Sequence, residues 1–347
     1  MKEIYWINAL KAICMISVYI VHSEEYYGTG GVSYGYVLRP FYVNAFFLVS
    51  GYLFLKKRKE LIGDRLFRKV CNVFWKLILP TILFATIIYI PKMLFHATSK
   101  LTFGQYVYDV FGGVSYWFTS ALAVAQLILI ALVFLLKERS LNAYLVVAII
   151  LSIISYFLCG IYKSSFPWNY KAGMGVVILM VLGGYYQMKE DKINKFILSS
   201  LGGLFLTFFY CVMLLLARVI YIPTTVRVGI DLLGMIVVLV GCAWVIWLVR
   251  KLPQISFLSF IGRNSIVYYF FSGVFPASIG LVFSKLFPEK NYLITSAVIL
   301  LSLVASTIVV VLLNRYIPWM LDFRRLKKII NKYLIINEKY PCNFFVW

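Results

Sequence analysis

The chain of 347 residues is 62% hydrophobic and only 14% charged, with a mean hydropathy of +0.88. Soluble domains are about 45–50% apolar, so the composition excludes an ordinary soluble domain and predicts a multi-pass membrane protein. The net charge of +21 does not indicate nucleic-acid binding, because the basic residues lie mainly in short loops beside apolar stretches, where membrane topology and anionic lipid explain them.

Ten apolar stretches, each about as long as a helix needs to be to cross the hydrocarbon, predict an all-α bundle of about ten transmembrane helices. They span residues 4–22, 41–55, 73–90, 117–136, 141–158, 172–188, 197–217, 229–249, 256–280 and 293–313. Lys and Arg concentrate in alternate connecting segments, so the positive-inside rule places both termini in the cytoplasm. We expect one membrane domain over residues 1–313 and a basic cytoplasmic tail over 314–347 that forms a helix on the membrane surface.

The first apolar stretch holds two ionisable groups, Lys11 and His22. At about 100° per residue, the eleven-residue step between them returns to within about 20° of the same helix face, about 16 Å further along the axis. The predicted topology places Lys11 in the cytoplasmic half of this helix and His22 at its outer end. A charge inside the membrane is a functional hypothesis by default, so this face is predicted to line a functional site.

His22 is the candidate for acid–base chemistry, because a neutral imidazole can accept a proton at physiological pH, as a general base must. Glu24 and Glu25 follow directly, and either carboxylate could orient the ring. For Lys11 we expect contact with the phosphate or carbonyl of a cytoplasmic donor, or with a neighbouring helix. The plain alternatives are a histidine at the water interface beside two solvated acids, and a lysine whose ammonium snorkels to the nearer surface.

The second stretch contains Phe46-Phe47-Leu48-Val49-Ser50-Gly51-Tyr52-Leu53 and ends at a basic segment. Ser50 and Gly51 are small residues of the kind that lets helices approach closely, so packing is favoured for them over catalysis. The fourth stretch begins with Tyr116-Trp117-Phe118, and the ninth contains Ile261-Gly262-Arg263-Asn264-Ser265 followed by Tyr269.

Basic residues surround the start of the third stretch. Arg65, Arg68 and Lys69 precede it, and Lys76 lies inside its apolar run. Four basic residues would suit a ligand with several phosphates, which needs several Lys or Arg contacts. For the first three, composition alone favours ordinary positive-inside topology, which accounts less readily for the deeper Lys76.

Asp231 lies near the start of the eighth stretch, close in sequence to Arg218 and Arg227. It could bind the hydroxyls of an acceptor, but an ion pair with one of the arginines is the favoured explanation. The six cysteines show no spacing typical of a disulfide framework or a metal site, and no bound metal is expected.

Together these motifs resemble the acyltransferase-3 family of integral membrane O-acyltransferases. The matching elements are the Lys11-x10-His22 pair, the FFxxSGYL core, the basic segment that leads to Pro80, WF-x-x-x-L from Trp117, and the segment resembling LGR-x-S-x-x-x-Y that ends at Tyr269. Relatives often continue the last element with a histidine where this chain has Phe271-Ser272, so no function is carried over to that position.

The resemblance implies transfer of an acyl group, which we expect to be acetyl, from cytoplasmic acyl-CoA to a hydroxyl of an extracytoplasmic glycan, in a bacterial plasma membrane. No permanently bound cofactor is expected. The expected site residues are His22, Lys11 and Glu25 in catalysis, Arg65, Arg68, Lys69 and Lys76 in donor binding, and Glu24, Trp117 and Asp231 in substrate binding.

An exporter of polysaccharide or lipid-linked sugar is the main alternative, since ten helices, an aromatic outer loop and internal charges also suit a transporter. Against it, the sequence shows no paired halves with matching broken helices. A non-catalytic membrane sensor or scaffold, in which Lys11 and His22 are structural, is a third interpretation. The sequence predicts no particular oligomeric state.

Overall fold

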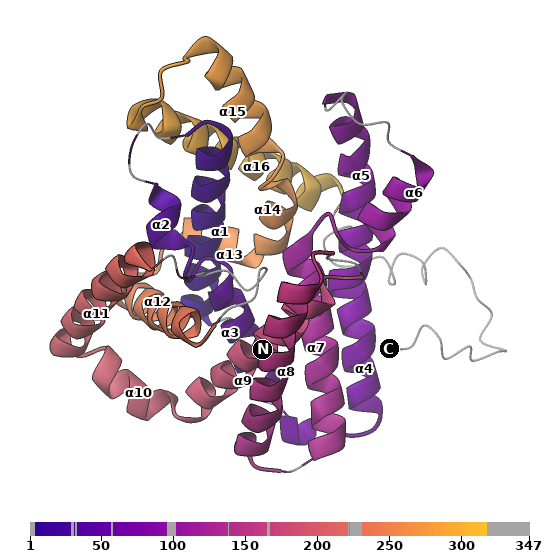
Figure 1. The fold of residues 1–347 in the computed structure, drawn as a ribbon, viewed down its shortest axis with the longest axis vertical. Coiled ribbons are helices and arrows are strands. Elements are labelled where there is room, and N and C mark those ends of the chain that lie inside the picture. The colour runs from indigo at the N-terminus through magenta and orange to yellow at the C-terminus, as the bar shows by residue number, and fades with distance from the viewer. Residues whose placement is uncertain are drawn as a thin grey trace.

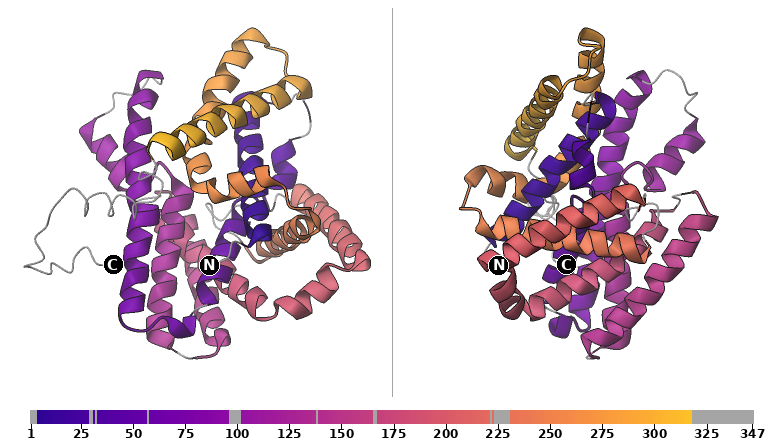
Figure 2. Two further views of the ribbon diagram at one scale, coloured as in Figure 1. Left: turned by 180° about the vertical axis from the view of Figure 1, so that it is seen from behind. Right: turned by 60° about the vertical axis from the view of Figure 1, so that its left-hand side comes forward.

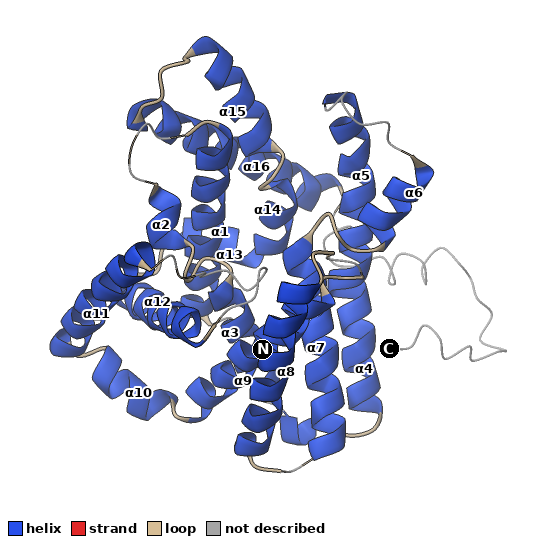
Figure 3. Cartoon of the chain, viewed as in Figure 1, coloured by secondary structure: helices blue, strands red, loops and turns tan. Residues whose placement is uncertain are grey.

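The computed structural model describes residues 4–28, 31, 33–56, 58–95, 102–137, 139–164, 167–220, 222 and 231–317. Every regular element in this part of the chain is a helix, which confirms the all-α prediction (Figures 1 and 3). The α-helices are α1 (Tyr5–Tyr26), α2 (Tyr34–Leu38), α3 (Asn44–Leu55), α4 (Asp64–Val73), α5 (Leu79–Phe95), α6 (Phe103–Tyr106), α7 (Trp117–Leu136), α8 (Leu141–Ile161), α9 (Tyr170–Met188), α10 (Glu190–Ile197), α11 (Ser200–Val219), α12 (Leu232–Lys251), α13 (Ser256–Arg263), α14 (Ser265–Phe271), α15 (Phe275–Leu286) and α16 (Tyr292–Tyr316). A 3-10 turn covers Arg58–Glu60, and π-helical segments cover Phe74–Ile78 and Val107–Phe111.

Seven helices in the described part of the chain are long and apolar enough to cross a membrane, as expected for a multi-pass membrane protein. One of them is a continuous span that joins α4, the first π-helical segment and α5 over Asp64–Tyr89. The predicted count of ten is not confirmed, because three predicted stretches differ. Helix α3 has only 12 residues, and α9 has 19 residues but is not among the seven. The stretch 256–280 is broken, with α14 and α15 bent by 41°, and this pair gives eight spans if it counts as one.

The predicted boundary at residue 313 between membrane domain and tail stays a prediction. Helix α16 continues to Tyr316, past the expected end of the membrane domain at residue 313. The rest of the predicted basic tail, from residue 318, lies outside the described residues. The cytoplasmic placement of both termini stays a prediction.

Helix α1 lies inside the bundle, between helices from both ends of the chain (Figures 1 and 2). It contacts the early α2 and α3 and the late helices α12 to α16. In its most apolar window 72% of the residues are buried, against 17% for α8, so α1 is an interior helix and α8 a peripheral one. Gly262 of α13 sits directly on α1, since a Cβ there would lie 2.0 Å from the backbone oxygen of Asn8. The side chains of α1 therefore face protein along most of its length.

Glycines bring α3 and α9 into direct backbone contact. A Cβ on Gly51 would lie 1.9 Å from the oxygen of Met180, and a Cβ on Gly183 would lie 1.9 Å from the oxygen of Leu48. Such close approach through small residues is typical of membrane helix pairs. The packing role predicted for Gly51 is confirmed, while Ser50 accepts a hydrogen bond of 3.0 Å from Gln126 Nε2 on α7.

Candidate active site

Glu25 lies in the last turn of α1, and His22 lies about one turn before it on the same helix face. Nδ1 of His22 lies 3.0 Å from Oε2 of Glu25, and the two side chains are 34% and 47% exposed. A carboxylate can only accept here, so Nδ1 donates, and in the neutral imidazole the lone pair is then on Nε2. Within the described part of the chain, Nε2 makes no hydrogen bond. His22 is therefore arranged as an oriented base whose accepting nitrogen is available.

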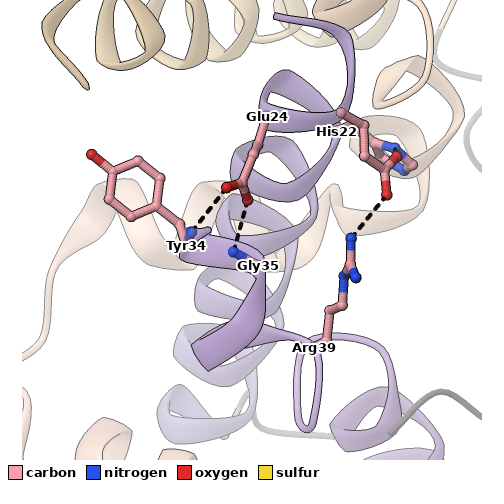
Figure 4. A network of polar contacts seen from close by, with 6 residues as sticks. His22, Glu24, Tyr34, Gly35 and Arg39 are labelled. Carbon is pink, nitrogen blue, oxygen red and sulfur yellow. Dashed lines mark hydrogen bonds and ion pairs between the residues drawn. The ribbon is translucent and has the colours of Figure 1, made fainter. Parts of the chain in front are cut away.

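The segment after α1 folds back onto the two glutamates (Figure 4). Oε1 and Oε2 of Glu24 accept hydrogen bonds of 3.1 and 2.8 Å from the backbone N–H groups of Tyr34 and Gly35, in the first turn of α2. Arg39, just after α2, places its guanidinium 3.5 Å from Oε1 of Glu25. Each of the adjacent acids thus holds one end of α2.

The opposite side of this region is fixed by the chain between α15 and α16. The hydroxyl of Tyr27 donates to the backbone oxygens of Phe287 and Glu289, each at 3.2 Å. Burial raises the pKa of Tyr27, which keeps its hydroxyl protonated as a donor. Thr295 of α16 donates to the oxygen of Gly28 at 2.6 Å. The His22 end of α1 is therefore held by two separate segments of the chain.

Lys11, toward the other end of α1, is brought near a second cation, the exposed Lys76. Its half-buried ammonium lies close enough to that of Lys76 for their charges to interact, although the two residues are 65 positions apart. Lys76 lies in the π-helical segment Phe74–Ile78, and π-helical turns inside α-helices occur frequently at functional sites. Two like charges in a membrane protein repel one another unless an anion lies between them. An anion between the two ammonium groups would relieve this repulsion.

The remaining basic candidates lie on α4, before Lys76 in the same continuous span. Arg65 and Arg68 are exposed, and the Lys69 ammonium lies 5.2 Å from the ring centre of Phe54. Helix α4 lies at the end of the bundle opposite to the His22 end of α1 (Figures 1 and 2). Lys76 stands about 11 Å further along the helix than Lys69. Of these basic candidates, Lys76 is the one whose charge acts on Lys11.

The other sequence motifs meet around Phe118. Its backbone N–H donates to the hydroxyl of Tyr269 at 3.1 Å, and the hydroxyl of Tyr116 donates to the oxygen of Phe270 at 3.1 Å. The rings of Phe46 and Phe47 lie 5.3 and 5.1 Å from the Phe118 ring. Segments from α3, α7 and α14 that are far apart in the sequence thus form one aromatic cluster in the core.

Comparison with known proteins shows the family of the chain. The family model Acyl_transf_3, described as an acyltransferase domain, matches residues 4–315. The chain belongs to the acyltransferase-3 family. No curated protein and no solved structure matches it. With its apolar helices, this acyltransferase-3 protein is a membrane acyltransferase, as the sequence motifs predicted.

The structure gives the three predicted substrate-binding residues definite local positions. Oδ1 of Asp231 accepts from the N–H of Gly234 at 2.6 Å and caps α12. Arg218 instead lies over the Tyr36 ring, 6.0 Å from its centre, so the expected pair with Asp231 is not formed, while Arg227 lies outside the described residues. Trp117 begins α7 and is half-buried, and Glu24 holds α2 as described above. A role of these residues in substrate binding stays a prediction.

Sequence reasoning missed Arg39, although one signal was present. Arg39 is the only basic residue between His22 and the start of α3. Its contact with Glu25 depends on how the chain turns back after α1, which no local pattern encodes. Among the described residues, no group of three or more His, Cys, Asp and Glu side chains is placed to hold a metal ion.

A second polar group, also missed, lies near the start of α1. Arg250 of α12 forms an ion pair with Glu190, whose other carboxylate oxygen accepts a hydrogen bond of 2.5 Å from Tyr52. The Arg250 guanidinium stacks over the rings of Trp6 and Tyr186, at 4.2 and 5.6 Å from their centres. This group ties α1, α3, α9, α10 and α12 together, which indicates a structural role.

Proposed function

We propose that this membrane acyltransferase transfers an acyl group, in our expectation acetyl, from cytoplasmic acyl-CoA to a hydroxyl of an extracytoplasmic glycan. One observation supports the proposal above all others. The interior helix α1 carries an oriented histidine base near one end and, about 16 Å away along its axis, a lysine that meets a second cation. A reaction between a donor on one side of the membrane and an acceptor on the other needs a donor-binding group and a base at different depths, as Lys11 and His22 would provide.

On the donor side, the phosphates of coenzyme A would contact Arg65, Arg68 and Lys69. Lys76 and Lys11 would then bind a further anionic or carbonyl oxygen of the donor. Multiple charge-assisted hydrogen bonds of this kind suit phosphate oxygens well. The pantetheine arm would extend from there along α1 and bring the thioester toward His22.

On the acceptor side, Nε2 of His22 would take the proton of the sugar hydroxyl as its oxygen attacks the thioester carbonyl. The new C–O ester bond forms, the C–S bond breaks, and the coenzyme A thiolate leaves with the two bonding electrons. The carboxylate of Glu25 would stabilise the imidazolium that forms, as the acid does in hydrolase triads. The thiolate is then protonated, either by the proton that His22 took up or by water, which gives free coenzyme A.

The test is transfer of label from radiolabelled acetyl-CoA to a glycan acceptor by the purified full chain in lipid vesicles. We expect labelled glycan with the wild type and a large loss with His22→Ala at matched protein amounts. Mass spectrometry of surface glycans from cells that express either form would identify the acyl group. An exporter would instead raise surface glycan abundance without adding mass, and that result would overturn the proposal.

A further inference from the structure

The carboxylate of Glu25 is engaged at both of its oxygens. Oε2 meets Nδ1 of His22 at 3.0 Å, and Oε1 faces the guanidinium of Arg39 at 3.5 Å (Figure 4). In the described part of the chain, the side-chain hydrogen bonds and ion pairs at this end of α1 connect Arg39 to His22 through Glu25. Whatever fixes the rotamer of Glu25 therefore also fixes the imidazole.

Arg39 is itself held in place by the fold. Glu24 binds the first turn of α2 through two backbone N–H groups, and Arg39 follows the last turn of the same short helix. Its neighbour Pro40 is buried and leads into the core residue Phe41. Both ends of the segment that presents the guanidinium are thus anchored, one to α1 and one to the bundle interior.

We infer that Arg39 is a positioning residue for acyl transfer, which holds the Glu25 carboxylate in the orientation that presents Oε2 to His22. The inference rests on the proposed function. Glu25 is about half exposed, and a long acidic side chain at such a site otherwise samples several rotamers in water. In most of those rotamers the hydrogen bond to Nδ1 is absent, and Nε2 is no longer directed to one place.

The guanidinium suits this task for a geometric reason. Its donors lie in one plane, so one group can hold a carboxylate while the rest of the fork packs against the chain. A lysine keeps the charge but not the planar fork. Arg39→Lys should therefore retain part of the effect, and Arg39→Ala should lose all of it.

The experiment is a double-mutant cycle on the full chain in lipid vesicles, with Arg39→Ala, Glu25→Ala and the combined variant. We expect Arg39→Ala to lower kcat about three- to fivefold, since both partners are about half exposed, with KM for donor and acceptor unchanged. In the Glu25→Ala background, Arg39→Ala should have no further effect. Arg39→Lys should restore at least half of the activity. Lys285→Ala removes another exposed cation, at the end of α15, and serves as the matched control.

The outcomes separate this inference from the proposed function. Three results would overturn the positioning role while His22 remained essential. The first is a wild-type kcat in Arg39→Ala, and the second is an equal loss from Arg39→Ala in the wild-type and Glu25→Ala backgrounds. The third is a raised KM for the acceptor at unchanged kcat. No transfer by the wild type, or full transfer by His22→Ala, would overturn the proposed function and the inference with it. The amount of each variant in the membrane and its thermal transition, matched to the wild type, exclude misfolding as the cause of a loss.

Discussion

The backbone oxygen of Met180 occupies the place that a side chain on Gly51 would need, since it lies 1.9 Å from where the Cβ would be. Because the obstacle is backbone and not a flexible side chain, α3 cannot accept even a methyl group here without moving away from α9. Contact between the two helices therefore requires a glycine at position 51.

We expect Gly51→Ala to destabilise the protein by about 1–3 kcal/mol, the usual cost of overpacking. The measurement is the thermal transition of the purified protein in detergent. Gly160→Ala is the matched control, because Gly160 is also helical but has nothing within 4 Å of its Cβ position. An equal transition temperature for Gly51→Ala and the wild type would contradict the close packing of α3 on α9.

His22→Ala is expected to lower the rate of acyl transfer by about 10²- to 10⁴-fold, the range for loss of a general base. The rate is best measured in single-turnover experiments with saturating donor. His96→Ala, which changes the one other histidine of the chain, provides the control and should retain wild-type activity. A similar loss in both variants would indicate a general effect of the substitutions instead of base catalysis.

Lys76→Ala is expected to raise KM for the acyl-CoA donor about tenfold, because a charge-assisted contact to the donor is lost. Lys11→Ala should have a similar effect, and the double variant should show less than the product of the two, since both ammonium groups would bind the same anion. Lys195→Ala on α10 removes an exposed cation elsewhere and should leave KM unchanged. An unchanged KM in Lys11→Ala would favour a lysine that only snorkels to the surface.

Arg250→Ala should lower the free energy of unfolding by about 2–3 kcal/mol. The substitution leaves Glu190 without its ion-pair partner and removes the cation that stacks on Trp6 and Tyr186. Thermal unfolding in detergent measures the change. The neighbouring Lys251 is exposed on the same helix, so Lys251→Ala should unfold at the wild-type temperature.

The sequence predicted the helical class because it follows from local composition and helical period. Hydropathy alone could not locate the break between α14 and α15, since Ser272, Gly273 and Val274 interrupt a helix within a stretch that remains apolar. It also assigned a full span to 41–55, where α3 is only 12 residues long. Element length depends on where neighbouring helices leave room, which a single stretch does not encode.

In the candidate site, too, contacts within one helix could be predicted from the sequence, whereas contacts between different elements could not. Glu25 lies one helical turn from His22, so its contact was predictable from the period of a helix. The meeting of Lys11 with Lys76 and the contact of Arg39 with Glu25 join residues from different elements, and both depend on tertiary packing. For the same reason, Asp231 was expected to pair with an arginine, whereas it caps the helix that it precedes.

The interior position of α1 has a consequence for biogenesis. This helix is synthesised first, yet most of its neighbours, α12 to α16, are synthesised last. During translation α1 must therefore wait in the bilayer with Lys11 lacking its final surroundings, at a stage when an intramembrane charge is costly. Contacts of such large sequence separation form slowly. Assembly of the bundle around α1 is thus a late step. A chain truncated before α13 would insert α1 into the membrane but would lack most of the helices that surround it.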